Sequence, residues 1–433
     1  MNPEFRRQLW LQFSVTRLIV LPLLVLACFA AAGLSQPNDL PQTLAWVGAV
    51  LFGLLVWGMG TLAAGASVID EITEHTWDQQ RMSALQPWAM TWGKLAGATS
   101  YGWYGGLICL LVAVPGAVLQ GHGNRVLWFV VAGGLGGILL QALLIAVNLQ
   151  VAKAGGRITR GGLAALVVMV MVLWSVVALI RAFNDEQAMW WGQTFEWLNF
   201  TVASLALFAG CGLVAAWRSM ADVLAVRQWP WGWPALACVI TAYLAGFSPE
   251  HRLAVFSVTG LMVSSVFTYA ALLTEPQLRP MWQRVATRLG SCQWRAALQQ
   301  LPRWPTTLAL ALPFAVLAVL SMPPESGPPL RVLGSPVGFL SMAWVMLMAR
   351  DCALALFLAF SPTGRRPLRS FLVVMLVLYG LLPWLLRSVG STLLPGLVQP
   401  LLMGGVLALV FAALHLVLAL GLLRWRWQAT APA

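Results

Sequence analysis

The side chains most able to do chemistry in this chain form a short acidic segment. Four of its 14 Asp and Glu residues, Asp70, Glu71, Glu74 and Asp78, fall between positions 70 and 78, with His75 among them. Carboxylates beside a histidine can act as general acids and bases, or can bind a basic protein surface. Because charges are costly in hydrocarbon, we expect this segment to be a water-facing loop.

The rest of the chain is strongly apolar. It has 433 residues, of which 60% are hydrophobic and only 9% charged, and a mean hydropathy of +0.79. Apolar runs of about 20 residues, the length of a membrane-spanning helix, recur throughout. The sequence therefore predicts an all-α polytopic membrane protein with about 12 spans, at residues 18–34, 42–64, 95–118, 127–151, 162–182, 197–217, 232–248, 253–274, 305–322, 335–350, 370–388 and 398–423.

The basic residues predict the orientation of these spans. The net charge is +12, and most of the 26 Lys and Arg residues fall in segments that share one side when the N-terminus is cytoplasmic. The positive-inside rule then predicts that both termini are cytoplasmic, and the basic excess suits contact with anionic membrane lipids. Because the chain has no soluble basic domain, we expect no nucleic-acid partner.

The cysteines and histidines argue against a bound metal or cofactor in this chain. The six cysteines are scattered, without a CxxC pair or a Cys/His cluster, so we expect neither a disulfide framework nor a zinc site. His415 lies inside the last predicted span, where it could form a hydrogen bond between helices or serve a proton relay.

Two amphipathic segments organise the chain. Near the N-terminus, Phe5, Leu9 and Phe13 are four residues apart and predict an interfacial helix, although span one could also simply extend into water. A second basic segment at 275–303 predicts a cytoplasmic linker with an amphipathic helix. It would join residues 1–274, with eight spans, to residues 304–433, with four. Each part would carry an amphipathic helix, two spans and a polar loop, which lies at 65–94 in the first part and at 361–369 in the second. The two parts could therefore have arisen by an internal duplication whose sequences have since diverged.

The acidic segment is part of a longer polar stretch, residues 66–94, that is too polar to span. Ile69 and Ile72 give one partial helical face, and Met82, Leu85 and Met90 give another. Pro87 interrupts the stretch, so we predict two short surface helices with a bend.

This arrangement resembles the export-type (type-2) permease subunits of ABC transporters. These permeases begin with an amphipathic elbow helix and two spans, followed by a cytoplasmic segment that reads roughly Glu-x-x-x-Gly-Thr, a leucine-rich turn with Ser and Pro, and Gly-Lys. The resemblance covers about residues 1–220. It departs where His75 replaces the usual Gly and where Ala84 stands at the usual Pro. The matching and neighbouring residues are Asp70, Glu71, Glu74, Thr76, Asp78, Arg81, Pro87, Gly93 and Lys94.

The resemblance implies that segment 66–94 is a coupling helix that docks on a separate ATP-binding subunit. It also implies a permease in the bacterial cytoplasmic (inner) membrane, acting as a homodimer or with a related permease. The chain itself is not expected to be an enzyme or to bind ATP, because Gly93-Lys94 lacks the flanking Gly and Ser/Thr of a P-loop.

A second charged pair, Arg350-Asp351, lies near the end of predicted span ten. Adjacent residues do not share a helix face, so we expect no private salt bridge between them. We expect the pair at the cytoplasmic interface, before a second coupling-like helix at 352–360 and the basic turn with Arg365 and Arg366. These two arginines, with Arg369, fit charges that orient the spans, and the alternative is that they contact the same partner. The alternative is a span from 336 to 360 that buries the pair among helices, as in ion pathways.

Two other function classes fit parts of the sequence. A secondary, ion-coupled transporter fits the number of spans but usually has ionisable residues at the membrane midplane. A membrane enzyme acting on lipid-linked substrates could use the acids at 70–78, but no matched base or metal pair accompanies them.

Overall fold

The computed structural model describes residues 2–74, 76, 82, 85–121, 123–153, 187–248, 252–321, 331–332, 335–361, 367–389, 394–403 and 405–429. It divides into two compact units, each described separately below. Unit 1 comprises Met1–Ala188 and Thr194–Gln228, and unit 2 comprises Met189–Gln193 and Trp229–Ala433. The units divide near Gln228, well before the linker at 275–303 that the sequence analysis proposed as the boundary.

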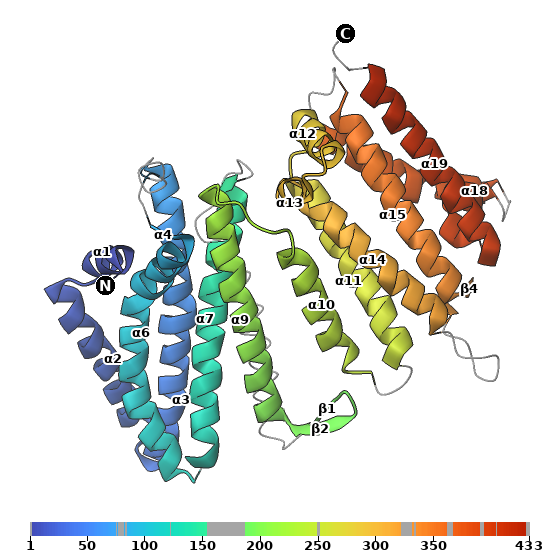
Figure 1. The fold of residues 1–433 in the computed structure, drawn as a ribbon. Helices are drawn as coiled ribbons and strands as arrows, with labels where there is room; N and C mark the ends of the chain where they lie inside the picture. The colour runs from blue at the N-terminus through green and yellow to red at the C-terminus, as the bar shows by residue number, and fades with distance from the viewer. Residues whose placement is uncertain are drawn as a thin grey trace. The chain divides into compact units, whose positions relative to one another are not determined.

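Unit 1 is a bundle of long helices (Figure 1). In chain order its elements are α1 (Pro3–Gln12), α2 (Val15–Ser35), the 3-10 turn η1 (Pro37–Asp39), α3 (Leu40–Phe52), the π-helical segment η2 (Gly53–Met59), α4 (Gly60–Thr73), α6 (Pro87–Leu119), α7 (Gly123–Lys153) and α9 (Trp197–Val223). A two-stranded sheet of β1 (Gln187–Trp190) and β2 (Gln193–Glu196) precedes α9.

Unit 2 is also helical. Its elements are α10 (Gly232–Ala245), α11 (Arg252–Thr274), α12 (Arg279–Gly290), α13 (Trp294–Leu298), α14 (Arg303–Leu320), β3 (Arg331–Val332), β4 (Ser335–Pro336), α15 (Val337–Ala359), α16 (Pro367–Leu376), the π-helical segment η3 (Val377–Leu381), α17 (Leu382–Ser388), α18 (Leu394–Val398), η4 (Pro400–Leu402) and α19 (Gly405–Ala429). The short strands β3 and β4 pair antiparallel.

The helices confirm an all-α polytopic membrane protein. Within the described residues, ten helices are long and apolar enough to cross a membrane, and each coincides with a predicted span. Of the other two predictions, 162–182 lies outside the described residues, and 232–248 corresponds to the shorter apolar helix α10, of 14 residues. The count of twelve and the orientation of the termini therefore stay predictions.

Local signals explain where the first helices begin. The side chain of Asn2 caps α1 by accepting the Glu4 N–H at 3.0 Å, and Ser14 caps α2 in the same way through Arg17. Both caps satisfy N–H groups that lack a partner in the first helical turn. The chain consequently breaks cleanly between the short α1 and the long α2.

Pro87 starts a helix, where the sequence analysis predicted a bend. It occupies the first turn of α6, a helix of 33 residues. Proline is well suited to this position because its missing N–H would have no partner there. Ile69 and Ile72 lie in the last turns of α4, so the part of the predicted stretch 66–94 that lies between α4 and α6 is only residues 74–86.

Candidate functional site

The first candidate site lies where α1 packs against the start of α6. Gly93 and Gly97 make this approach possible, because a Cβ at Gly93 would lie 2.7 Å from the Glu4 side chain. A Cβ at Gly97 would similarly lie 2.6 Å from the side chain of Gln8. Small residues let helices approach closely, as they do at membrane helix interfaces. The Gly93 of the predicted Gly-Lys pair therefore admits the N-terminal helix.

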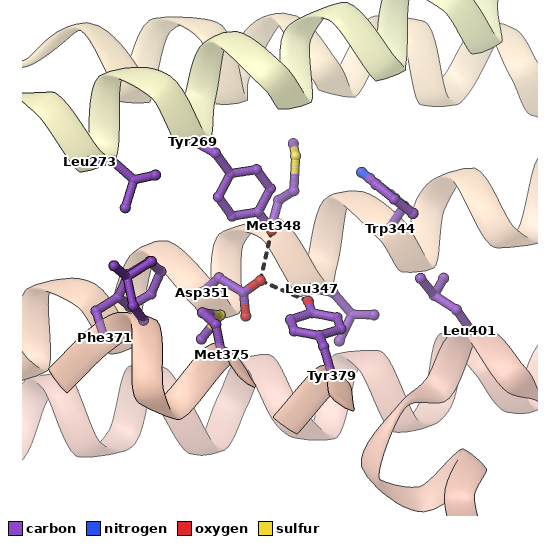
Figure 2. A pocket seen from close by; sticks show the side chains of 11 residues that line it. Tyr269, Leu273, Trp344, Leu347, Met348, Asp351, Phe371, Met375, Tyr379 and Leu401 are labelled. Atoms are coloured by element: carbon purple, nitrogen blue, oxygen red, sulfur yellow. Dashed lines mark hydrogen bonds between the residues drawn. The ribbon is translucent and has the colours of Figure 1, made fainter. Parts of the chain in front are cut away.

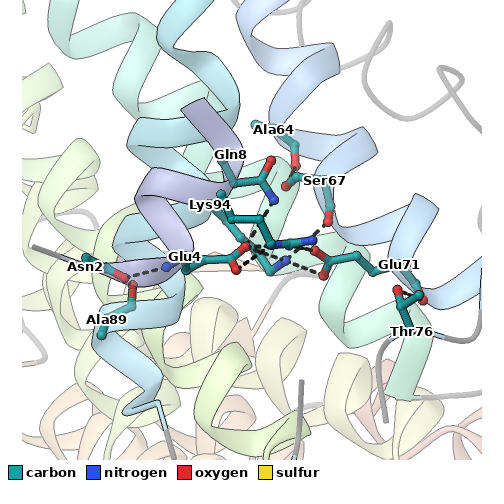
Figure 3. Close-up of polar contacts among 10 residues, drawn as sticks. Asn2, Glu4, Gln8, Ala64, Ser67, Glu71, Thr76, Ala89 and Lys94 are labelled. Carbon is teal, nitrogen blue, oxygen red and sulfur yellow. Dashed lines mark hydrogen bonds and ion pairs between the residues drawn. The ribbon is translucent and has the colours of Figure 1, made fainter. Parts of the chain in front are cut away.

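Lys94 lies at the centre of a buried ion network (Figure 3). Its side chain has no exposed surface, and its Nζ pairs with a carboxylate oxygen of Glu71 and with Glu4 Oε1 at 3.2 Å. The same Nζ donates to the Ser67 carbonyl at 3.4 Å. Because a buried charge is tolerated only when paired, these partners make the position of Lys94 possible.

Arg7 extends the network to the surface of α1. Its guanidinium pairs with Glu4, with Nη2 2.8 Å from Oε1 and Nε 3.0 Å from Oε2, and it also donates to Glu71. Gln8 Nε2 donates to Glu4 Oε1 at 3.0 Å. Three helices, α1, α4 and α6, are therefore joined through two carboxylates and two cations.

These contacts control the ionisation of Glu4. Burial by itself would raise the pKa of this carboxyl. The hydrogen bonds from Arg7 and Gln8, with the charges of Lys94 and Arg7, outweigh that effect and lower the pKa from 4.5 to about 2. Glu4 therefore stays ionised over the physiological range, and the pKa of Arg7 is raised in turn, mainly by its hydrogen bond to Glu4.

The network corrects the expectation that the acids at 70–78 are all exposed. Glu71 is only 6% exposed and satisfies Lys94 and Arg7 within the chain. Glu74 is exposed and Asp70 is partly exposed, while Thr76 closes the end of α4 by donating its N–H to the Glu71 carbonyl at 3.1 Å. The predicted residues His75, Asp78 and Arg81 lie outside the described residues.

A second buried cluster lies in unit 2 and overturns the expected interfacial position of Arg350-Asp351. Both residues lie inside the continuous helix α15 and are 3% and 0% exposed. Contrary to the sequence analysis, they form a salt bridge, with Arg350 Nη2 2.7 Å from Asp351 Oδ1. Both Nε and Nη2 of the long arginine side chain reach Asp351 Oδ1, at 2.9 and 2.7 Å, a reach that the argument from helix faces alone did not consider. Neither residue is available at a surface contact, and Arg365 and Arg366 lie outside the described residues.

Partners from three other helical segments make this burial possible. The hydroxyls of Tyr269 and Tyr379 both donate to Asp351 Oδ2 at 2.7 Å, and Arg350 Nη1 lies 3.2 Å from His415 Nδ1. The Arg350 guanidinium also lies 5.1 Å from the centre of the Tyr379 ring. His415 thus forms the interhelical contact that the sequence analysis considered for it.

A cavity of about 350 Å³ opens beside Asp351 (Figure 2). Its lining is almost wholly apolar and includes Trp344, Met348 and Phe371 beside the two tyrosines. Both oxygens of Asp351 already accept hydrogen bonds. The cavity therefore has the volume of a small-molecule site and could hold an apolar group.

Sequence reasoning missed Glu4, Arg7, Tyr269 and Tyr379 as partners. The spacing of Glu4 and Arg7, three residues apart on one helix, was a readable signal for an ion pair. Nothing in the sequence linked the tyrosines to an aspartate 82 and 28 residues away. Among the described residues no group of three or more His, Cys, Asp and Glu could hold a metal ion.

Comparisons with protein-family models, curated proteins and solved structures give no match for this chain. Its class therefore rests on its own helices and sites. They define an integral, all-α polytopic membrane protein with buried ionic clusters in both compact units.

Replacing Lys94 tests the network in unit 1. Lys94→Met should lower the free energy of unfolding by about 3 kcal/mol or more, because it leaves buried carboxylates without their central cation. The measurement is thermal or denaturant unfolding in detergent. Adding Glu71→Gln to Lys94→Met should recover part of the loss, and equal stabilities of the single and double variants would contradict the network.

Acid should weaken the same network through Glu4. Because the folded-state pKa lies below 4.5, the stabilisation is complete above pH 4.5 and is lost as the pH falls toward about 2. Unfolding midpoints measured in detergent over this range should fall with pH, and Glu4→Gln should flatten the slope. The matched control Asp39→Asn removes an exposed carboxylate and should leave the slope of the unfolding midpoint against pH unchanged.

The cluster in unit 2 predicts that two substitutions lower the free energy of unfolding by different amounts. Asp351→Asn should lower the unfolding free energy by about 3 kcal/mol, because Arg350 loses its buried counter-ion. Tyr379→Phe removes one hydrogen bond and should cost about 1 kcal/mol. Unfolding in detergent measures both, and an equal or smaller effect of Asp351→Asn would count against a buried ion pair.

Proposed function

We propose that this chain is the membrane-spanning permease subunit of an ATP-driven ABC exporter, in a bacterial cytoplasmic membrane. The observation that carries the proposal is the ion network of Glu4, Arg7, Glu71 and Lys94. It joins the N-terminal helix and two spans directly beside the polar segment 74–86. In such a permease the ATP-binding subunit moves the cytoplasmic ends of the spans. These ends must therefore be held rigidly together, so that the spans move as one body.

The mechanism follows from the cost of separating buried charges. Glu71 lies in the last turn of α4 and Lys94 in the third turn of α6, so segment 74–86 starts and ends on helices that the ion pair holds together. Breaking that pair would leave uncompensated charges, which is strongly unfavourable. A force applied to the segment is therefore transmitted to both spans as one body.

The partner is a separate ATP-binding subunit, because the chain lacks a P-loop of its own. The exposed Glu74, with Asp78 nearby in the sequence, favours a basic groove on that subunit, since opposite charges speed docking and fix its register. The chain would carry out no covalent chemistry itself. On α1, Trp10 and Leu11 are 82% and 54% exposed and suit contact with lipids at the interface.

A secondary, ion-coupled transporter is the second candidate. The observation that favours it is Asp351, a carboxylate buried within a span together with Arg350 and His415. Ionisable residues inside spans commonly belong to ion or proton pathways. Uptake driven by an ion gradient into vesicles that contain only the purified chain would establish this alternative.

Charge reversal of Glu74 and Asp78 tests the proposed docking. Glu74→Lys with Asp78→Lys should weaken binding of the co-expressed ATP-binding subunit by about thirtyfold, since two lost charge contacts of about 1 kcal/mol each amount to about 2 kcal/mol. Pulldown from detergent extracts at low salt measures the effect. Asp39→Lys, an exposed acid at the opposite end of the α3–α4 span, should leave binding unchanged. Undiminished binding by the double variant would refute docking through this segment.

A further inference from the structure

Unit 2 contains a second polar segment closed by an ion pair, in the same place relative to its helices. Glu275 follows the end of α11, and Arg303 begins α14. Arg303 Nε lies 3.2 Å from Glu275 Oε1, and its backbone N–H donates to Glu275 Oε2 at 2.8 Å. The paired residues are 28 positions apart here and 23 apart for Glu71 and Lys94. Each pair joins the end of one apolar helix to the start of the next.

The helices around the two segments also correspond. In unit 1 the polar segment follows α2 and the α3–α4 span, and in unit 2 it follows α10 and α11. The spans flanking the segment pack on each other in both units, the α3–α4 span with α6 and α11 with α14. The last described span of each unit packs on the second helix after the segment, α9 on α7 and α19 on α15.

Buried polar contacts repeat this correspondence. In unit 1, Gln141 of α7 donates from Nε2 to the Val56 carbonyl, in the span before the segment, at 3.0 Å. In unit 2, Asp351 of α15 accepts a hydrogen bond from Tyr269 in α11, which is again the span before the segment. The same pair of helices is therefore joined through buried polar groups in each unit, although the residue types differ.

The segment in unit 2 is firmly attached to its spans. Gln277 Oε1 accepts hydrogen bonds from the indoles of Trp282 in α12, at 3.4 Å, and Trp304 in α14, at 3.1 Å, and the two rings lie 5.6 Å apart. Arg279 donates to the Trp427 carbonyl at 3.1 Å, which attaches α12 to α19 as well. Such a segment moves together with α11, α14 and α19.

Its outer surface is basic and apolar. Segment 275–303 contains five arginines and a single acid, Glu275. Arg284 and Arg295 are exposed, and Leu278, Trp294 and Leu298 are 59%, 59% and 37% exposed. Tryptophan and arginine together are typical of the residues that dominate protein interfaces.

We propose that α12 and α13 form a second docking segment for an ATP-binding subunit, so that one copy of this chain engages two such subunits. This inference rests on the proposed function, and it replaces the duplication considered from the sequence, which paired 65–94 with 361–369. Both segments then fit one kind of groove, which is apolar at its centre and carries basic side chains for Glu74 and acidic side chains for Arg284 and Arg295.

The exposed Cys292, between α12 and α13, provides the probe. The full chain is co-expressed with the ATP-binding protein encoded beside it, reconstituted in nanodiscs, and labelled with a maleimide benzophenone. Irradiation should yield a covalent adduct with the ATP-binding protein, identified by mass spectrometry. The matched control Cys292→Ser should lose this adduct. Native mass spectrometry of the unlabelled complex should give one copy of the chain with two ATP-binding subunits.

A surface variant adds a functional measurement. Trp294→Ala with Arg295→Glu should lower the ATP hydrolysis rate of the complex by about tenfold. The control Arg387→Glu, at an exposed arginine of α17, should keep the rate. An adduct with lipid alone, or a complex with two copies of the chain, would overturn the second docking segment while ATP-binding subunits still copurify. If none copurifies with the unaltered chain, the proposed function itself fails.

Discussion

The structure depends on one constraint: a cation without exposed surface must have its counter-charges supplied by the chain itself. Lys94 is fully buried, and the carboxylates of Glu4 and Glu71 reach it from two other helices. Removing water from these groups strengthens their attraction and makes any unpaired member costly. The positions of α1, α4 and α6 at this end of unit 1 are consequently linked.

The same principle operates once more, at the buried pair Arg350-Asp351, while a third ion pair, Glu275 with Arg303, is only partly buried. Glu275 and Arg303 close the polar segment of unit 2, and Asp351 with Arg350 forms a cluster inside α15. The ion pairs of Lys94 and Arg303 join the ends of neighbouring apolar helices. The cluster around Asp351 instead joins helices along their length. Two of the ion pairs therefore join the ends of helices, whereas the third lies beside the cavity.

The sequence predicted the apolar helices well, but it did not predict which residues α1 buries against the rest of the chain. The spacing of Phe5, Leu9 and Phe13 indicated an apolar face for contact with the membrane interface, and it gave no sign that Glu4 and Gln8 are the residues that α1 buries within the protein. Phe13 lies beyond its end and packs edge-on against Tyr101 at 6.2 Å. The spacing of apolar residues indicates which face of a helix is apolar and which is polar. It does not report a polar partner that another helix provides.

The sequence alone determined that this chain crosses a membrane many times, because length and apolarity of a segment are local properties. It also located the polar stretch between the second and third spans. Only the tertiary structure decided which charges neutralise one another, since Glu4 and Lys94 are 90 positions apart and Glu71 and Lys94 are 23 apart. Such pairing depends on the distance between atoms in the folded chain, which neither composition nor periodicity contains.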